Sequence, residues 1–150
     1  LPAVRVRSDV ERKRLRADAK DDLYTPEMNR RTYARLAECA ESCLLAGLNV
    51  VVDATFLERA DRDLVRGVAR RLRTRFAIIA CQASEATLRA RVRERMLAGS
   101  DVSDADEDVV TRQLSHATPL SIAECHDVVI ARTHEPNIVE RTVTALRHLV

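Results

Sequence analysis

Apolar positions recur along the chain at two spacings, and each spacing predicts a different kind of element. Near the start, Val4 and Val6 alternate with Arg5 and Arg7, which is typical of a short strand. Further runs of strand-forming residues occupy 49–52, 76–81 and 128–130. Between them, apolar residues recur every three or four positions, which predicts amphipathic helices over about 10–17, 25–46, 57–72, 84–98, 103–116 and 136–149.

Several helix ends carry chemical signals. Thr25 is expected to be an N-cap because its hydroxyl accepts a backbone hydrogen bond, and Pro26 suits the first helical position. Gly47 fits just past the end of that helix. The caps expected at the other helices are Ser8 or Asp9, Ser84, and a capping box over 103–106.

The predicted elements follow the order β-α-α-β-α-β-α-α-β-α. Strands that alternate with helices predict an α/β fold in which helices cover both faces of a parallel sheet. Residues 76–81 are almost wholly apolar, so this strand is expected to be buried on both faces. A length of 150 residues predicts one domain spanning 1–150.

Composition narrows the class of protein. Apolar residues make up 46% of the chain and charged residues 32%, which is typical of a soluble globular protein and excludes a disordered one. No run of about 18 apolar residues is present, so a cytoplasmic protein without a membrane segment is expected. A net charge of +2 and an aromatic content of 3% argue against nucleic acid as a partner. Cys39 and Cys43 are i,i+4 on a helix without a C-x-x-C motif, so buried free thiols are expected.

Two acids follow predicted strands. Asp9 comes just after the first strand and Asp53 ends the second. Because parallel strands end at the same edge of a sheet, both carboxylates are expected there, where they suit Mg²⁺ binding or proton transfer. Arg12 lies one helical turn after Asp9. The structural alternatives are that Asp53 is an ordinary loop acid and that Asp9 only caps a helix.

Four arginines alternate through the segment "LRARVRERMLAG", at 89, 91, 93 and 95. Arginine presents a fork of donors that matches phosphate oxygens. An acidic stretch and a further predicted helix follow, so residues of about 89–118 have the pattern of a helical hairpin that closes over a nucleotide. The alternative is an ordinary solvated helix face.

Three segments together resemble the P-loop kinase-like family: 4–15, 88–106 and the long segment "YTPEMNRRTYARLAECAESCLLAGLNVVVDATFLERADRD". That family includes polynucleotide kinase, gluconate kinase, chloramphenicol phosphotransferase and zeta toxins. The resemblance is greatest to bacterial AAA-family ATPases, some of which are fused behind an aminoglycoside-phosphotransferase-like domain. It implies a three-layer α/β/α parallel sheet with a helical lid. It also implies ATP and Mg²⁺ as cofactors and transfer of the γ-phosphate to a hydroxyl of a small acceptor.

The resemblance also assigns roles to single residues. Asp9 resembles the base that takes the acceptor's proton, and Arg91 and Arg95 resemble the lid pair that neutralises the transferring phosphate. Asp53 resembles the acid close to Mg²⁺. The residues that resemble substrate-binding positions are Arg12, Thr55, Arg59 and Arg62.

One departure from the family is clear. The phosphate-binding motif G-x-x-x-x-G-K-[ST] is absent, since neither Lys13 nor Lys20 follows a glycine. The chain also opens on Leu1, so we expect that it lacks the first, central strand and its P-loop, leaves two strand edges open and binds ATP weakly by itself. A relative that never had this loop is the alternative. A non-catalytic ATP-binding regulatory module is the alternative to a kinase.

Overall fold

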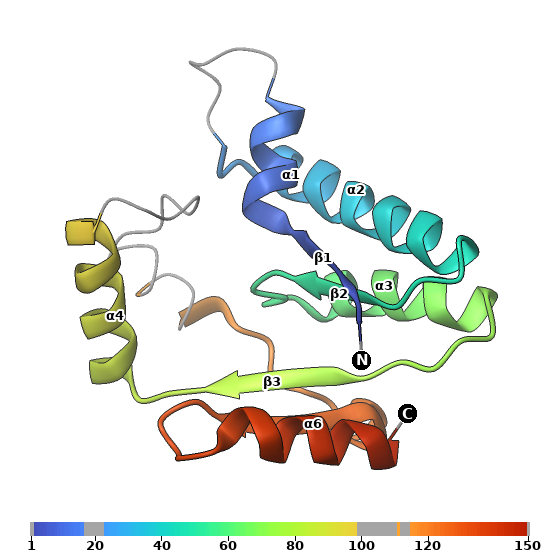
Figure 1. Ribbon diagram of the computed structural model, residues 1–150. Coiled ribbons are helices and arrows are strands. Elements are labelled where there is room, and N and C mark those ends of the chain that lie inside the picture. The colour runs from blue at the N-terminus through green and yellow to red at the C-terminus, as the bar shows by residue number, and fades with distance from the viewer. Residues whose placement is uncertain (1, 17–22, 99–110, 112–114, 150) are drawn as a thin grey trace. The chain divides into compact units, whose positions relative to one another are not determined.

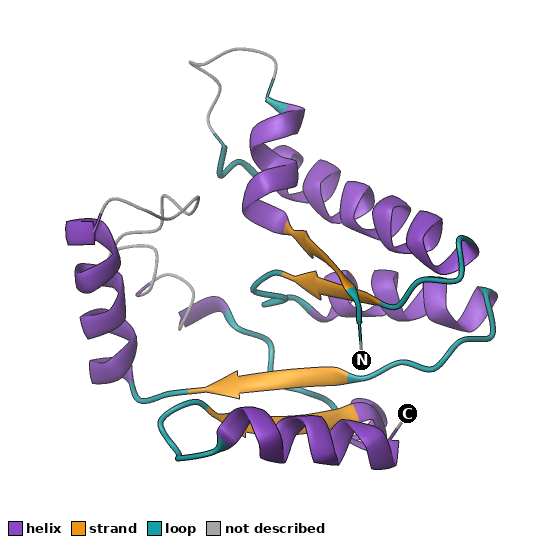
Figure 2. Ribbon diagram, in the orientation of Figure 1, coloured by secondary structure: helices purple, strands orange, loops and turns teal. Residues whose placement is uncertain are grey.

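The computed structural model describes residues 2–16, 23–98, 111 and 115–149. The chain divides into two compact units, Leu1–Thr74 and Arg75–Val150, and each is described by itself (Figure 1). Unit 1 contains β1 (Val4–Arg7), α1 (Ser8–Leu15), α2 (Pro26–Leu45), β2 (Val50–Asp53) and α3 (Arg59–Arg71). Unit 2 contains β3 (Ile78–Gln82), α4 (Glu85–Ala98), the 3₁₀ helix η1 (Ile122–Asp127), β4 (Val128–Arg132) and α6 (Ile138–Leu149). The predicted α/β class is confirmed (Figure 2).

In unit 1, β1 and β2 form a parallel pair in which Val4 lies opposite Val50 and Arg7 opposite Asp53. Alternate residues of a strand face opposite sides of the sheet. The valines at even positions therefore share one face, and Val6, Val50 and Val52 pack in a core that contains the fully buried Leu36 of α2. This core fixes the register, because a one-residue slip would turn the arginines of β1 towards α2.

Both ends of α2 match the sequence signals. The Thr25 hydroxyl accepts a hydrogen bond from the backbone N–H of Met28 at 3.1 Å, and Pro26 is the first helical residue. After the helix ends, Gly47 has a φ of 75°, in the left-handed region that residues with a side chain rarely adopt. These predictions are confirmed.

The predicted cap of the first helix is wrong. The N-cap of α1 is Arg7, without a side-chain cap hydrogen bond, and Ser8 and Asp9 are already helical. The reason is that β1 runs into α1 with no intervening loop, so the two expected cap residues lie in the first turn.

In unit 2, β3 and β4 are also parallel, with Ile78 opposite Val128 and Gln82 opposite Arg132. The expectation that the third strand is buried on both faces is wrong, because Ile79 is 40% exposed and Cys81 is exposed. Helix α6 packs against β4, and β3 receives less cover. Among the described residues no third strand joins either pair, so each of the four strands has one edge without a strand partner.

The caps predicted at Ser84 and at 103–106 have different outcomes. Ser84 caps α4 as predicted, accepting from the Thr87 N–H at 3.2 Å. The capping box at 103–106 and most of the predicted helix that follows lie outside the described residues. A capping box that was not predicted opens η1, where the buried Glu124 carboxylate accepts from the N–H and hydroxyl of Ser121.

All four cysteines are free thiols, as predicted, but the expected burial is wrong, because Cys39 and Cys43 are half-buried and Cys81 and Cys125 are exposed. None of the helices in the described part of the chain has both the length and the apolar character needed to cross a bilayer.

Candidate functional site

The two candidate acids lie at the same end of one parallel pair. Asp53 is the last residue of β2 and lies opposite Arg7, the last residue of β1. Asp9 follows two residues later, half-buried in the first turn of α1. Within unit 1 both residues therefore lie where a strand of this parallel pair ends, Asp53 at the end of β2 and Asp9 just after the end of β1. This is the edge at which α/β proteins bind their ligands.

Asp53 already has cationic partners. Its Oδ2 accepts from Arg5 Nη2 at 2.5 Å and from Arg5 Nε at 3.1 Å, and Arg7 Nε lies 3.6 Å away. The carboxylate side chain is 41% exposed, so the ion pairs are open to water. The sequence analysis did not foresee these pairs. The signal was available, because a parallel register places alternate residues of neighbouring strands on one face.

The loop after β2 is held by the buried hydroxyl of Tyr33 on α2. This oxygen accepts a hydrogen bond from the Phe56 N–H at 3.1 Å and lies 3.3 Å from Thr55 Oγ1. The rings of Tyr33 and Phe56 are 5.4 Å apart, and Phe56 has a φ of 47°, an uncommon conformation for a bulky residue. Burial raises the pKa of Tyr33, and the hydrogen bond with Thr55 opposes this. The exposed Thr55 is therefore held in place from behind.

Arg62 holds the same loop from α3. It is buried, and its Nη1 donates to the carbonyls of Phe56 at 3.0 Å and Leu57 at 3.4 Å. Arg59, one turn earlier, is exposed and pairs with Asp63 at 3.3 Å. Both arginines were predicted to bind substrate, and the structure distinguishes them, since Arg62 is buried and bonds the loop whereas Arg59 lies on the surface.

Arg12 is also buried. Its Nη1 donates to the Leu23 carbonyl at 2.9 Å and to Asn29 Oδ1 at 2.6 Å, and its guanidinium carbon lies 5.4 Å from the centre of the Tyr24 ring. Among the described residues its Nε has no hydrogen-bond partner. Arg12 thus ties the segment before α2 to α1.

The candidate lid arginines belong to unit 2. Arg91 is exposed and donates from Nη1 to Thr133 Oγ1 at 2.8 Å and from Nη2 to the Thr133 carbonyl at 3.1 Å. The Thr133 hydroxyl in turn donates to the Gln82 carbonyl at 3.2 Å, so Arg91 is anchored to the ends of β3 and β4. Arg95 lies one turn further along α4 and is half-buried.

A resident metal cluster is not built into the described residues, since no three His, Cys, Asp or Glu side chains gather to hold an ion. Mg²⁺ needs fewer protein ligands than such a cluster provides, because one carboxylate together with waters and substrate phosphates can complete its coordination. Asp53 fits that limited role, with one oxygen used by Arg5 and the other without a partner among the described residues.

Comparison with known proteins gives a family and a fold. A family model described as an AAA domain matches residues 1–120. A gluconokinase from Sinorhizobium meliloti 1021 has a similar structure, with a TM-score of 0.68 and 19% sequence identity over 98% of this chain and 77% of that one. No curated protein matches significantly. The similarity in structure shows a shared fold, and the family model extends over most of the sequence. The chain therefore belongs to the P-loop kinase-like family of AAA domains.

Proposed function

We propose that the chain forms part of an ATP-dependent phosphotransferase that moves the γ-phosphate to a hydroxyl of a small acceptor. The family and fold support nucleotide-dependent kinase chemistry in general terms. The observation that carries the finer proposal is the placement of Asp9 and Asp53 at one carboxyl edge of the β1–β2 pair. A kinase needs an acid at such an edge to accept the acceptor's proton, whereas a binding module does not.

Asp9 is the proposed base. It lies in the first turn of α1, two residues after the end of β1. Arg12, three residues later, is proposed to shape the acceptor site indirectly, by holding Leu23 and Asn29 against α1.

Thr55, Arg59 and Arg62 are proposed to serve the substrates in different ways. Thr55 presents an exposed hydroxyl that Tyr33 holds in place. Arg62 donates hydrogen bonds to carbonyls of the loop. Arg59 would bind a substrate with its exposed guanidinium after its hydrogen bond with Asp63 breaks. Arg62 therefore acts as a positioning residue in this proposal, without touching the substrate.

Mg²⁺, when bound with ATP, would offset the negative charge of the phosphates. Asp53 would hold it through water, because Arg5 bonds one of its oxygens directly. Arg91 and Arg95 would supply the remaining positive charge. The arginine fork can exchange the neutral oxygens of Thr133 for the charged oxygens of a phosphate, with which its hydrogen bonds are stronger.

The second candidate is an ATP-binding regulatory module that does not transfer phosphate. It is favoured by the ion pairs that already neutralise Asp53.

Asp9→Asn in the full-length protein separates the two candidates. Removal of a base is expected to lower kcat by about 10²–10⁴-fold while the dissociation constant for ATP stays within about twofold. Acceptors to screen are sugars, antibiotics and nucleoside 5′-hydroxyls. The control is Asp63→Asn, an exposed acid on α3 that should leave both quantities unchanged. Equal loss of transfer and ATP affinity would make Asp9 structural, and unchanged transfer would show that Asp9 is not the base. ATP binding without transfer to any acceptor in the unsubstituted protein would favour the regulatory module.

A further inference from the structure

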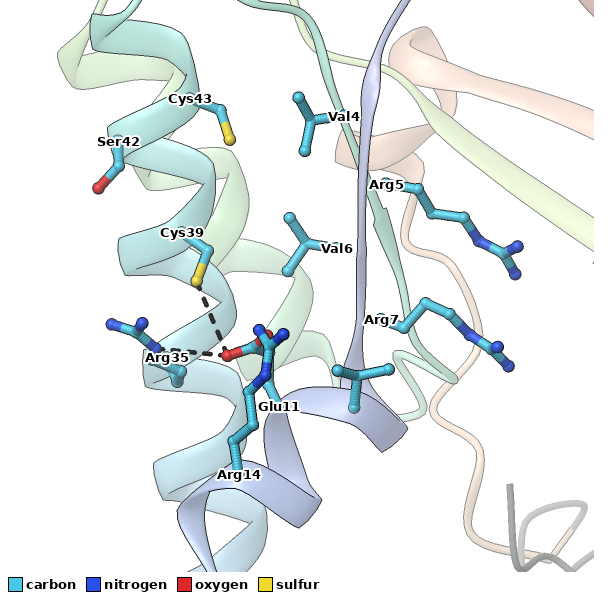
Figure 3. A pocket seen from close by; sticks show the side chains of 11 residues that line it. Val4, Arg5, Val6, Arg7, Glu11, Arg14, Arg35, Cys39, Ser42 and Cys43 are labelled. Carbon is cyan, nitrogen blue, oxygen red and sulfur yellow. Dashed lines mark hydrogen bonds and ion pairs between the residues drawn. The ribbon is translucent and has the colours of Figure 1, made fainter. Parts of the chain in front are cut away.

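A hollow of about 430 Å³ lies between β1 and α2 in unit 1 (Figure 3). Val4 and Val6 point into it from β1, and the thiols of Cys39 and Cys43 face them from α2 (Figure 3). The guanidinium groups of Arg5 and Arg7 point to the other side of the strand (Figure 3). The hollow is thus apolar on its inner walls, and its volume falls within the range of roughly 300–1,000 Å³ that ligand pockets occupy.

The strand beside the hollow has one open edge. Among the described residues β1 pairs only with β2. The Val4 N–H donates to the Asn49 carbonyl at 2.8 Å, so the peptide groups of Val4 face β2. Because peptide groups alternate along a strand, the N–H and C=O of Arg5 face outward. Unpaired groups of this kind are a template for another strand.

Charge beside β1 differs between the two sides of the strand. On the side of the hollow Arg14 and Arg35 lie with the acid Glu11. On the opposite side Arg5 and Arg7 lie beside Asp53. The buried carboxylate of Glu11 forms ion pairs with two arginines, with Arg14 Nη1 at 2.6 Å and with Arg35 Nε at 3.4 Å (Figure 3). Glu38 also pairs with Arg35, so the two arginines on the side of the hollow are matched by two acids, whereas on the opposite side both Arg5 and Arg7 lie within 3.6 Å of Asp53.

The thiols do not suit covalent chemistry. Cys39 Sγ lies 4.0 Å from Glu11 Oε2, and burial raises its pKa, an effect that the nearby Arg35 opposes. A thiol that stays protonated is a weak nucleophile. The hollow is therefore better suited to enclosing an apolar side chain than to redox chemistry.

We propose that β1 and this hollow bind an extended acidic segment of a partner protein as an added strand. The alternation of β1 defines the segment, because an added strand presents every second side chain to each face. Apolar side chains would enter the hollow beside Val4 and Val6, and acidic ones would lie beside Arg5 and Arg7. A second copy of β1 fits poorly, since paired copies would bring arginines opposite one another. This proposal does not depend on phosphotransfer.

The probe is the blocked peptide acetyl-Glu-Val-Glu-Val-Glu-amide, with the isomer acetyl-Glu-Glu-Glu-Val-Val-amide as control. Titration of the chain should show saturable binding of the alternating peptide and at least tenfold weaker binding of the isomer. Hydrogen exchange should slow at the Arg5 amide. Equal binding of both peptides, no saturable binding, or slowed exchange at Val50 and Val52 on the open edge of β2 would each overturn the proposal.

Two variants make the test specific to the hollow. Cys43→Phe fills it and should weaken peptide binding at least tenfold, whereas Cys81→Phe, at an exposed thiol of unit 2, should not change it. Arg5→Gln removes one charge at the surface and should weaken binding about threefold to fivefold, more at low than at high salt. Thermal melting of each variant shows whether the fold persists, and Arg5→Gln remains decisive if Cys43→Phe does not fold. Unchanged binding in Arg5→Gln would contradict the proposal.

Discussion

The candidate site residues of unit 1 and of unit 2 are held by contacts of different kinds. In unit 1 the loop that carries Thr55 is bonded by two buried side chains, Tyr33 on α2 and Arg62 on α3. In unit 2 Arg91 is anchored to the half-buried Thr133 through exposed hydrogen bonds. Loss of a buried partner leaves a polar group unsatisfied and costs about 1–3 kcal/mol, whereas an exposed contact exchanges readily with water.

This difference matches the roles proposed for the two regions. Fixed dipoles and side chains are useful where a site must keep its geometry between turnovers, since no reorganisation is then needed. A lid residue must instead leave one partner and find another when substrate binds. The buried network of unit 1 fits the first requirement, and the exposed contacts of Arg91 fit the second.

The largest loss of stability is expected for Arg62→Ala. Truncation removes the donor to the Phe56 and Leu57 carbonyls and leaves a cavity, so the free energy of unfolding should fall by about 2–4 kcal/mol. Arg59→Ala on the same helix breaks only an exposed i,i+4 pair and should cost no more than about 0.5 kcal/mol. Urea denaturation measures both. Similar losses in the two variants would show that the loop is not held by Arg62.

In unit 2, Arg91→Ala should lower activity strongly and change stability little. Loss of a cation at the transferring phosphate is expected to lower kcat of the full-length protein by about 10²–10³-fold. The free energy of unfolding should change by less than about 1 kcal/mol, because the contacts with Thr133 are exposed.

The matched control for Arg91 is Arg89→Ala, two residues earlier on α4. Arg89 forms an ion pair with Glu85 at 2.7 Å. The Arg89→Ala variant should leave kcat near its original value. A normal kcat in Arg91→Ala, or a large loss of stability, would remove Arg91 from the proposed chemistry.

Sequence reasoning succeeded where the signal is local. The ends of α2 follow from Thr25, Pro26 and Gly47 alone, because capping and left-handed φ depend on residues within one turn. The strand order and the parallel class follow from alternating patterns of apolar residues, which need no knowledge of tertiary packing. The same reasoning would have found η1, since Ser121 and Glu124 have the spacing of a capping box.

It failed where a residue's role depends on its neighbours across the fold. That Arg5 bonds Asp53 follows from the register of two strands 48 positions apart in sequence, and that Tyr33 bonds Phe56 follows from how α2 packs on β2. Arg59 and Arg62 look alike in sequence, and only the direction in which α3 faces separates them. The placement of Asp9 and Asp53 at one edge was predictable because topology alone determines it.

Tyr33→Phe tests the buried network more gently than Arg62→Ala. It keeps the ring and removes the oxygen that accepts from Phe56, so unfolding should become easier by about 1–2 kcal/mol at pH 7. The pKa of Tyr33 is raised above its ordinary 10.0, so the unfolded chain loses this proton first and the contribution to stability should fall as the pH rises above that value. Tyr33→Phe should abolish this alkaline loss. Tyr24→Phe, at a tyrosine that is 41% exposed, should retain it.

The smallest expected effect concerns Asp61, in the first turn of α3, where two influences oppose each other. A helix N-terminus stabilises a negative charge. Burial and the nearby Glu58 nevertheless raise the pKa of Asp61 above its ordinary 3.8, against the opposing effect of Arg62. The folded chain therefore holds this proton more tightly than the unfolded chain, and its contribution to stability falls as the pH rises through the window above 3.8.

Asp61→Asn removes the carboxylate and should raise the melting temperature by about 1–2 °C at pH 7, with little change near pH 3, where the native residue is already protonated. Asp63→Asn, which breaks an exposed pair with Arg59, should give no gain at either pH. Because the Asp61 charge also raises the pKa of Tyr33, the Asn variant should lower that pKa and make the alkaline loss of stability smaller. A lower melting temperature of Asp61→Asn at pH 7 would show that the helix N-terminus stabilises the Asp61 charge by more than burial destabilises it. The first turn of α3 would then be stabilised by this charge.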